Sequence, residues 1–276
     1  MLRKPVVAGT FYEKEGELLT EEIKQCFLKG VGKIPEVKKG KGKIKGVVVP
    51  HAGYYYSGYI ASYAYNEIAK DGFPDKFIII GPNHAGYGGI SIMTEGEWET
   101  PLGNVAISED AEKYCRGVIK NNRYAHQIEH SIEVQLPFLQ FLSHDFKFIP
   151  ICLGYSTLND IKEAGKILSE AENAIFIAST DFSHLDAIAF STPEEIKKYA
   201  EEKDMIAIKE ILKIDGIGLL KKVMEHNITM CGHMAVATML EALKGKANKT
   251  RLLKYATSYD VEPGIKCVGY ASIVIE

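Results

Sequence analysis

The sequence predicts a single α/β domain in which helices flank a central, largely parallel or mixed β-sheet. Short apolar runs rich in Val and Ile, bounded by Gly or Pro, alternate with segments of helical periodicity. Strands that are apolar along their whole length are typical of sheets covered on both faces. No internal repeat or Pro/Gly/Ser-rich linker divides the 276 residues, so residues 1–276 are expected to share one core.

Four apolar runs are predicted to be strands of this sheet, at residues 46–49, 77–80, 146–152 and 174–178. Two further strands, 252–258 and 267–275, flank Glu262-Pro263-Gly264 and are expected to pair as a hairpin. The segment 35–46 alternates lysines with glycine and apolar residues and is the main break in composition. We expect it to be a solvated surface loop that leads into the first of these strands.

Apolar residues at helical spacing predict the helices between the strands. Leu18, Leu19, Ile23, Cys26 and Phe27 indicate one helix. Residues 134–142 indicate another, with Pro137 in its first turn. The same pattern predicts helices over 56–70, 108–120, 158–170, 193–225 with a break near Asp215-Gly216, and 231–244.

Composition excludes several classes of protein. The 33 basic and 36 acidic residues give a net charge of −3, which provides no field for holding nucleic acid or an anionic membrane surface. No apolar run approaches the roughly 20 residues of a membrane-spanning helix, and the start of the chain lacks a signal-peptide pattern. Five scattered cysteines without CxxC spacing favour reduced thiols. We therefore expect a cytoplasmic protein.

Three predicted strands are each followed by a histidine, in the segments VVVPH, FIIIGPNH and AIFIASTDFSH. Ligands of open α/β sheets bind beyond the carboxyl ends of the strands, so His51, His84 and His184 are expected to converge there. Imidazole is the commonest nitrogen ligand of transition metals. Each histidine taken alone is also compatible with a loop or core residue bonded to the backbone.

Two other residues are candidates for the same site. Asp181, three residues before His184, is either a ligand or a partner that orients a ligand. Cys231 is expected in the first turn of a helix that Thr229 caps, where the helix N-terminus favours the thiolate. The alternative for Cys231 is a small buried residue at the start of that helix.

The segment RYAHQIEHSIEVQLPFL adds a second polar cluster. His130 and Glu133 are three residues apart on one helical face. We expect His130 to face the cleft and Glu133 to orient a partner there, the alternative for this segment being helix capping. Tyr54, close to His51, is also expected to line the cleft. The sequence contains no HExxH, phosphate-binding GK[ST] or GxSxG motif.

Seven segments together resemble the Memo family, also called AmmeMemoRadiSam system protein B. In chain order they are RKPVVAGTFYE, PHAGYYYSG, GPNHAGYGG, WETPLG, EHSIEVQLPFLQ, STDFSHL and MCGHMA, and the likeness extends from residue 3 to about residue 275. The resemblance implies a fold like that of the class III extradiol dioxygenases, which carry non-haem iron at one end of the sheet.

The resemblance also implies roles for individual residues. His51, His84 and Cys231 occupy the positions of the metal ligands, and His184 that of the dioxygenases' acid/base histidine. Asp181 is an additional candidate oxygen ligand. Extradiol dioxygenases bind Fe(II) with two histidines and a carboxylate, whereas here Cys231 takes the carboxylate's place. A thiolate favours Fe(II), Cu or Zn and changes the redox behaviour of bound iron.

Three functions are compatible with these expectations. The first is a non-haem iron oxidoreductase that acts on a small aromatic or enediol-like substrate, with Fe(II) as cofactor, His184 as proton acceptor and donor, and His130 hydrogen-bonded to substrate or oxygen. The second is a non-catalytic adaptor that binds metal or peptide. The third is a metal-dependent hydrolase. The resemblance further implies a pathway shared with a radical-SAM protein, and an oligomer is compatible with the sequence.

Overall fold

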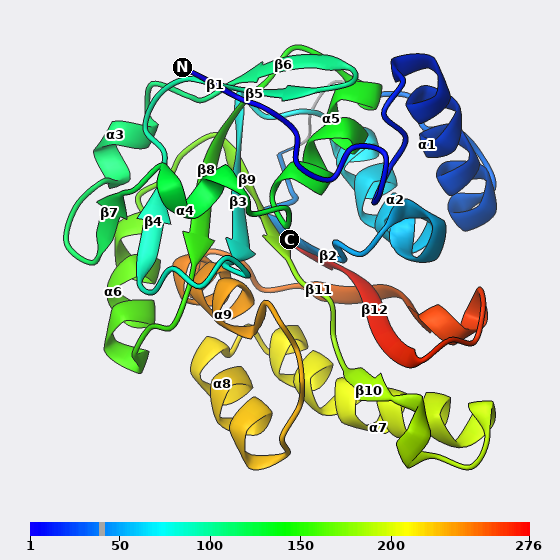
Figure 1. The fold of residues 1–276 in the computed structure, drawn as a ribbon. Helices are drawn as coiled ribbons and strands as arrows, with labels where there is room; N and C mark the ends of the chain where they lie inside the picture. The colour runs from blue at the N-terminus through cyan, green and yellow to red at the C-terminus, as the bar shows by residue number, and fades with distance from the viewer. Residues whose placement is uncertain (39–41) are drawn as a thin grey trace.

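A nine-stranded mixed sheet forms the centre of the computed structural model, which describes residues 1–38 and 42–276 (Figure 1). Its strands run in the order β10-β12-β2-β9-β3-β8-β4-β7, and β11 pairs with β12. The strands are β2 (Gly46–Val49), β3 (Lys76–Pro82), β4 (Ile90–Ile92), β7 (Ile119–Asn121), β8 (Lys147–Leu153), β9 (Ala174–Ser179), β10 (His184–Asp186), β11 (Thr250–Thr257) and β12 (Lys266–Ile275).

The middle of this sheet is parallel. β2, β9, β3 and β8 are parallel neighbours, and their residues are almost all buried. Val and Ile dominate these strands because β-branched side chains pack well on a pleated surface covered from both sides. All four strands therefore end at the same edge of the sheet, as the arrowheads of β3 and β8 show in Figure 1.

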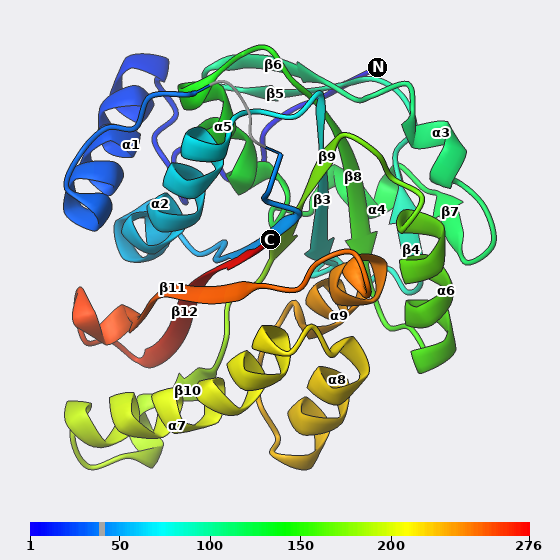
Figure 2. The same cartoon turned by 180° about the vertical axis from the view of Figure 1, so that it is seen from behind.

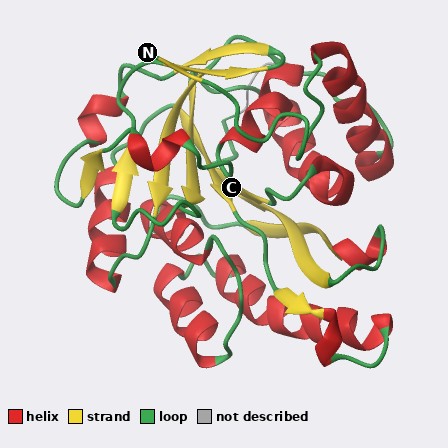
Figure 3. Ribbon diagram, in the orientation of Figure 1, coloured by secondary structure: helices red, strands yellow, loops and turns green. Residues whose placement is uncertain are grey.

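Helices pack around the sheet in two groups (Figures 2 and 3). α2, accompanied by α1 and α5, packs on β2, β11 and β12, while α9, accompanied by α6 and α8, packs on β2, β3, β8 and β9. The helices are α1 (Gly16–Val31), α2 (Tyr54–Asp71), α3 (Ala111–Tyr114), α4 (Tyr124–Gln127), α5 (Leu136–Leu142), α6 (Leu158–Leu168), α7 (Pro193–Leu212), α8 (Gly216–Glu225) and α9 (His233–Leu243). No helix within the described residues is both long and apolar enough to cross a membrane.

A second, small sheet lies beside the N-terminus. It has the order β1-β5-β6, formed by β1 (Leu2–Arg3), β5 (Glu97–Thr100) and β6 (Gly103–Ala106). β1 runs parallel to β5, so the first residues of the chain pair with residues 97 and 98. This sheet was not predicted, since strands of two to four residues show too little alternation of apolar and polar residues to be recognised in a sequence.

The predicted fold class is confirmed: the chain is a single α/β domain with a mixed, largely parallel sheet. The predicted helix over 108–120 is wrong. The helix α3 ends at Tyr114, Gly117 has a left-handed backbone with φ of +55°, and Ile119 begins β7, which pairs with β4. In the expected loop 35–46, residues 39–41 lie outside the described residues, and Gly46 begins β2.

Candidate metal centre

Three candidate residues follow neighbouring parallel strands at the same end of the sheet. His51 comes two residues after β2, His84 two residues after β3, and Asp181 two residues after β9, which lies between β2 and β3. Because parallel strands end at one edge, their following loops bring these side chains together. Cys231 reaches the same place from the loop before α9.

The ring of His51 is held in one tautomer by a serine. Nδ1 of His51 lies 3.0 Å from Oγ of Ser179. That hydroxyl donates to the carbonyl oxygen of Ser131 at 2.7 Å and accepts from the Gln135 amide at 2.8 Å. A serine has only one proton to donate, so Oγ accepts the Nδ1–H of His51 and Nε2 keeps its lone pair. Burial lowers the pKa of His51 to about 4, which keeps the ring neutral.

Glu129 orients His84 in the same way. Its fully buried carboxylate lies 3.0 Å from Nδ1 of His84 and also accepts the backbone N–H groups of His84, His130 and Ser131. Burial alone would raise the pKa of Glu129, but these hydrogen bonds and the His84 charge hold it at about 2. Although burial opposes the effect, Glu129 raises the pKa of His84 above its ordinary value. Nε2 of His84 is left for a ligand.

Cys231 is placed by the glycine that follows it. The backbone N–H of Gly232 donates to Oγ1 of Thr180 at 2.9 Å, and a Cβ on Gly232 would lie 2.5 Å from the carbonyl oxygen of Ser179. Only glycine allows this approach to the end of β9. Cys231 precedes α9, whose N-cap is Gly232, so its predicted place in the first helical turn is wrong. Burial raises the pKa of the Cys231 thiol above its ordinary value.

The three candidate ligand atoms lie close to one point. Sγ of Cys231 is 3.3 Å from Nε2 of His51, and the ligand atoms of His51, His84 and Cys231 all lie within 4.8 Å of one another. Ligands bound to one ion at ~2.0 to 2.3 Å in a tetrahedral site lie about 3.3 to 3.8 Å apart. The observed spacing fits a transition metal after small side-chain shifts. The His84 side chain is 38% exposed, which leaves this side of the centre open.

Asp181 binds the loop that carries His51. Its Oδ1 accepts the backbone N–H groups of His51 at 2.9 Å and Ala52 at 3.3 Å, and its own N–H points at Sγ of Cys231 at 3.3 Å. Its Oδ2 lies 4.0 Å from Nε2 of His51. Asp181 therefore has a positioning task in the structure, and ligation by Oδ2 stays a prediction.

His130 lies against both metal-site histidines. Its ring stacks on His84 with centroids 4.8 Å apart and meets His51 edge-on at 5.6 Å. The ring of Phe11 covers its other side, with centroids 4.8 Å apart. Within residues 1–38 and 42–276 neither ring nitrogen of His130 has a hydrogen-bond partner, since Nδ1 is 3.7 Å from Glu129. Burial lowers the pKa of His130, so its ring is neutral at neutral pH.

His184 is held at the start of β10. Its Nδ1 lies 2.9 Å from the carbonyl oxygen of Phe182 and 3.0 Å from that of Thr229, so Nδ1 carries the proton and Nε2 is the basic nitrogen. Thr229 also bonds the His184 backbone through its hydroxyl and does not cap α9. His184 belongs to neither group of clustered ligand atoms found among the described residues.

Two residues expected in the cleft have structural tasks instead. Glu133 is fully buried and accepts hydrogen bonds from Arg3, the Val6 and Val7 backbone and the Tyr12 hydroxyl, so it anchors the N-terminal segment.

Tyr54 is also buried, and its hydroxyl donates to the carbonyl oxygen of Val134 at 2.6 Å while its ring packs on Phe138. The helix predicted over 56–70 did not include Tyr54, which is the first residue of α2, and Glu133 begins a 3-10 turn while His130 precedes it outside any helix.

A family model described as Memo-like protein matches residues 3–274 of the chain. The chain belongs to this family. MEMO1 family proteins of Methanobrevibacter smithii and Methanopyrus kandleri are 43% and 42% identical to it, each with 99% of both chains covered. The MEMO1 family protein of Thermotoga maritima is 39% identical over the full length of both chains. The predicted resemblance to the Memo family is thus confirmed.

This Memo-like chain also shares its fold with a solved structure described as an uncharacterized protein of Escherichia coli K12. The TM-score is 0.56 at 10% sequence identity, and the match covers 84% of this chain and 100% of the other. At this identity the likeness shows the fold alone.

The residues that orient His51 and His84 in this Memo-like protein were not predicted from the sequence. Ser179 and Gln135 act on His51, and Glu129 acts on His84, through contacts between residues 44 to 128 positions apart. The one available signal was local: Glu129 and Ser131 flank His130 in the segment EHS, and Ser179 is the last residue of a predicted strand beside Asp181.

Proposed function

We propose that this Memo-like protein is a metal-dependent oxidoreductase of the non-haem iron type, acting on a small aromatic or enediol-like substrate. One observation supports this proposal above all. Nε2 of His51 lies 3.3 Å from Sγ of Cys231, a ring nitrogen of His84 lies within 4.8 Å of both ligand atoms, and Nδ1 of the two rings faces Ser179 and Glu129. Histidines that bind a metal typically have a fixed tautomer, because their other ring nitrogen donates to a carboxylate, a carbonyl or another hydrogen-bond acceptor.

Two imidazoles and one thiolate form a donor set that suits Fe(II), Cu and Zn. We propose Fe(II), because three protein ligands leave coordination positions free and the exposed side of His84 admits a substrate. When bound, a ferrous ion supplies redox chemistry and open coordination positions, which none of the side chains provides.

The proposed proton chemistry belongs to two further histidines. His130 faces the centre with a neutral ring and no hydrogen-bond partner among the described residues, so it is available to bond a substrate hydroxyl. His184 has its Nδ1 proton fixed by two carbonyl oxygens, so Nε2 is the atom that would accept a substrate proton and later return it.

Anaerobic loading with Fe(II), followed by oxygen-uptake measurements with catechols, tests the proposal. His51→Ala is expected to abolish metal binding. His184→Ala is expected to keep the metal and lose oxygen uptake, because His184 moves a proton and holds no metal. His144→Ala, at an exposed histidine away from the centre, is the matched control and should leave both properties unchanged.

Two outcomes would contradict the proposal that the protein is an oxidoreductase. Stoichiometric metal without turnover of any diol would favour the adaptor that binds metal or peptide. Stoichiometric zinc accompanied by hydrolysis, with His184→Ala hydrolytically inactive, would favour the metal-dependent hydrolase.

A further inference from the structure

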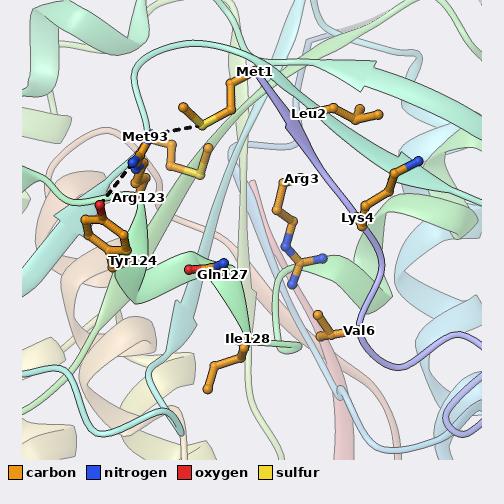
Figure 4. Close-up of a pocket in the computed structure, with 10 residues that line it drawn as sticks. All are labelled: Met1, Leu2, Arg3, Lys4, Val6, Met93, Arg123, Tyr124, Gln127 and Ile128. Carbon is orange, nitrogen blue, oxygen red and sulfur yellow. Dashed lines mark hydrogen bonds between the residues drawn. The ribbon is translucent and has the colours of Figure 1, made fainter.

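A cavity of about 600 Å³ lies between the N-terminal strand β1 and the helix α4 (Figure 4). Large apolar side chains form most of its lining: Met1, Leu2, Val6, Met93, Tyr124 and Ile128. Three of them are more than half exposed, namely Met1 at 65%, Ile128 at 64% and Tyr124 at 53%. Several exposed apolar residues around one hollow indicate a binding surface more often than single ones do.

This cavity is distinct from the metal centre. Gln127 and Ile128 form part of its wall, whereas the next residue, Glu129, does not line the cavity and bonds His84. None of the three candidate metal ligands lines the cavity. The two sites thus use different residues, although those of one follow directly on those of the other at Ile128 and Glu129.

Two of the three cationic side chains in the wall are paired with carboxylates. The guanidinium of Arg3 is buried, bonds the Glu133 carboxylate and the carbonyl oxygen of Glu129, and lies 4.3 Å from the ring centre of Trp98. Lys4 pairs with Glu99 at 2.5 Å. Both side chains thus already have an acidic partner.

Arg123, the third cationic side chain of the wall, has no acidic partner among the described residues. Its guanidinium bonds the Tyr124 hydroxyl at 3.0 Å, lies 4.8 Å from that ring's centre, and is 3.7 Å from Sδ of Met1. Across residues 1–38 and 42–276 it has no carboxylate within 4.0 Å. The Gln127 amide, drawn near the middle of the lining in Figure 4, likewise makes no hydrogen bond within the described chain. Within the described residues, the cavity therefore offers a guanidinium without a carboxylate partner and an amide without a hydrogen-bond partner, beside apolar walls.

We propose that this cavity binds a small apolar carboxylate, with the carboxylate on Arg123 and the Gln127 amide and the hydrocarbon body against the apolar walls. A planar guanidinium matches a carboxylate with two parallel hydrogen bonds. Met1 and Met93 adapt to the shape of a ligand and make favourable contacts with aromatic rings. The volume lies within the range of small-molecule sites, about 300 to 1,000 Å³.

Calorimetric titration of the full chain with 4-phenylbutyrate and its neutral amide, 4-phenylbutyramide, tests the proposed charge recognition. The carboxylate is expected to bind at least tenfold more tightly than the amide. Arg123→Gln should remove that difference while leaving amide binding unchanged. Arg116→Gln is the matched control, because Arg116 is an exposed arginine paired with Glu170 elsewhere. Equal affinities of the two ligands, or an unchanged preference in Arg123→Gln, would overturn the proposal.

The place of binding is tested on the unaltered protein by NMR of methionine methyl groups. The chain has seven methionines, and only Met1 and Met93 line the cavity. Titration with 4-phenylbutyrate should shift these two signals and leave those of Met234 and Met239, both in α9, in place. Shifts confined to the α9 methionines would overturn the proposed location. Ile128→Asp should weaken the binding of both ligands, because it places a charge in the apolar wall.

Discussion

Ser179 and Glu129 perform equivalent tasks at the two histidines of the candidate centre. Each accepts the Nδ1 proton of one ring and leaves Nε2 for a ligand. The two differ in charge, because Ser179 is neutral whereas Glu129 is a buried anion whose pKa is held at about 2. A buried anion behind His84 increases the basicity of that ring and partly balances the charge of a bound cation.

Glu129→Gln is therefore expected to lower metal affinity by about 10- to 100-fold, the usual cost of removing an outer partner of a ligating histidine. Competition with a chelator measures the affinity, and circular dichroism checks that the variant is folded. Glu225→Gln, at an exposed helix end, is the control and should bind metal normally. Unchanged affinity in Glu129→Gln would show that Glu129 is not part of the centre.

Asp204 is a second buried carboxylate with consequences for stability. It accepts hydrogen bonds from Ser183 and Tyr255, and no cation lies within 4.0 Å of it in the described chain. Burial raises the pKa of Asp204 to about 6, although these hydrogen bonds partly offset the rise. A folded-state pKa above the unfolded value means that the native protein binds the proton more tightly. The stability gained from that proton is present at low pH and is lost as the pH rises through about 6.

Compared with Asp204→Asn, which does not titrate, the natural protein should lose roughly 1 to 2 kcal/mol of unfolding free energy between pH 5 and pH 8. Urea unfolding of both proteins at each pH measures this difference. Parallel pH profiles of the two proteins would contradict the raised pKa.

The helix α7 packs closely against β12 at Asp204. A Cβ on Gly269 would lie 1.9 Å from Oδ2 of Asp204 and 3.2 Å from Cβ of Phe182. Glycine at position 269 thus makes room for Asp204, which in turn bonds Ser183 directly before His184. The packing of these two elements therefore supports the loop that carries His184.

Gly269→Ala is expected to destabilise the protein by about 1 to 3 kcal/mol through overpacking. Adding Asp204→Ala should relieve the overlap, so the double variant should lose less stability than the sum of the single changes. Gly264→Ala is the control, because nothing lies within 4 Å of its added Cβ. Thermal or urea unfolding measures all four variants, and strict additivity would contradict the proposed overlap.

The elements differ in how far the sequence predicted them. The strand at 46–49 has the predicted bounds, and the break at Asp215-Gly216 separates α7 from α8. Both carry strong local signals, namely a continuous β-branched run and a helix-capping aspartate followed by glycine. β7 was missed because its three residues show no periodicity, and pairing with β4 determines its conformation.

In the candidate site, the ligands were predicted from the sequence but the residues that orient them were not. His51, His84 and His184 were expected to converge because strand ends converge in any parallel sheet. Ligand atoms of His51 and His84 do cluster, whereas His184 belongs to neither cluster of the described residues. The orienting partners Ser179 and Glu129 and the anchoring task of Glu133 depend on side-chain contacts that no spacing encodes. Sequence alone therefore identified the candidate ligands better than the residues that hold them.

The N-terminal segment connects the small sheet with the rest of the molecule through Glu133. This carboxylate accepts hydrogen bonds from Arg3, from the backbone of Val6 and Val7, and from Tyr12. The adjacent Lys4 forms a different kind of pair, with the partly exposed Glu99. The chain thus offers a buried and an exposed ion pair on neighbouring residues.

Glu133→Ala is expected to cost about 3 to 5 kcal/mol of stability, because it leaves the buried Arg3 charge unpaired. Glu99→Ala should cost under about 1 kcal/mol, as for other exposed pairs. Hydrogen exchange should also become faster at the Val6 and Val7 amides in Glu133→Ala alone. Similar losses of stability in both variants would show that the segment is not anchored through Glu133.

We expect one metal ion to bind between two imidazoles and a thiolate at the end of the parallel strands. Anomalous diffraction from crystals loaded anaerobically with Fe(II) tests it most directly. One peak is expected, at ~2.0 to 2.3 Å from Nε2 of His51, Nε2 of His84 and Sγ of Cys231. A peak instead among His84, Glu129 and His130, the other cluster of ligand atoms in the described chain, or no peak at all, would contradict it.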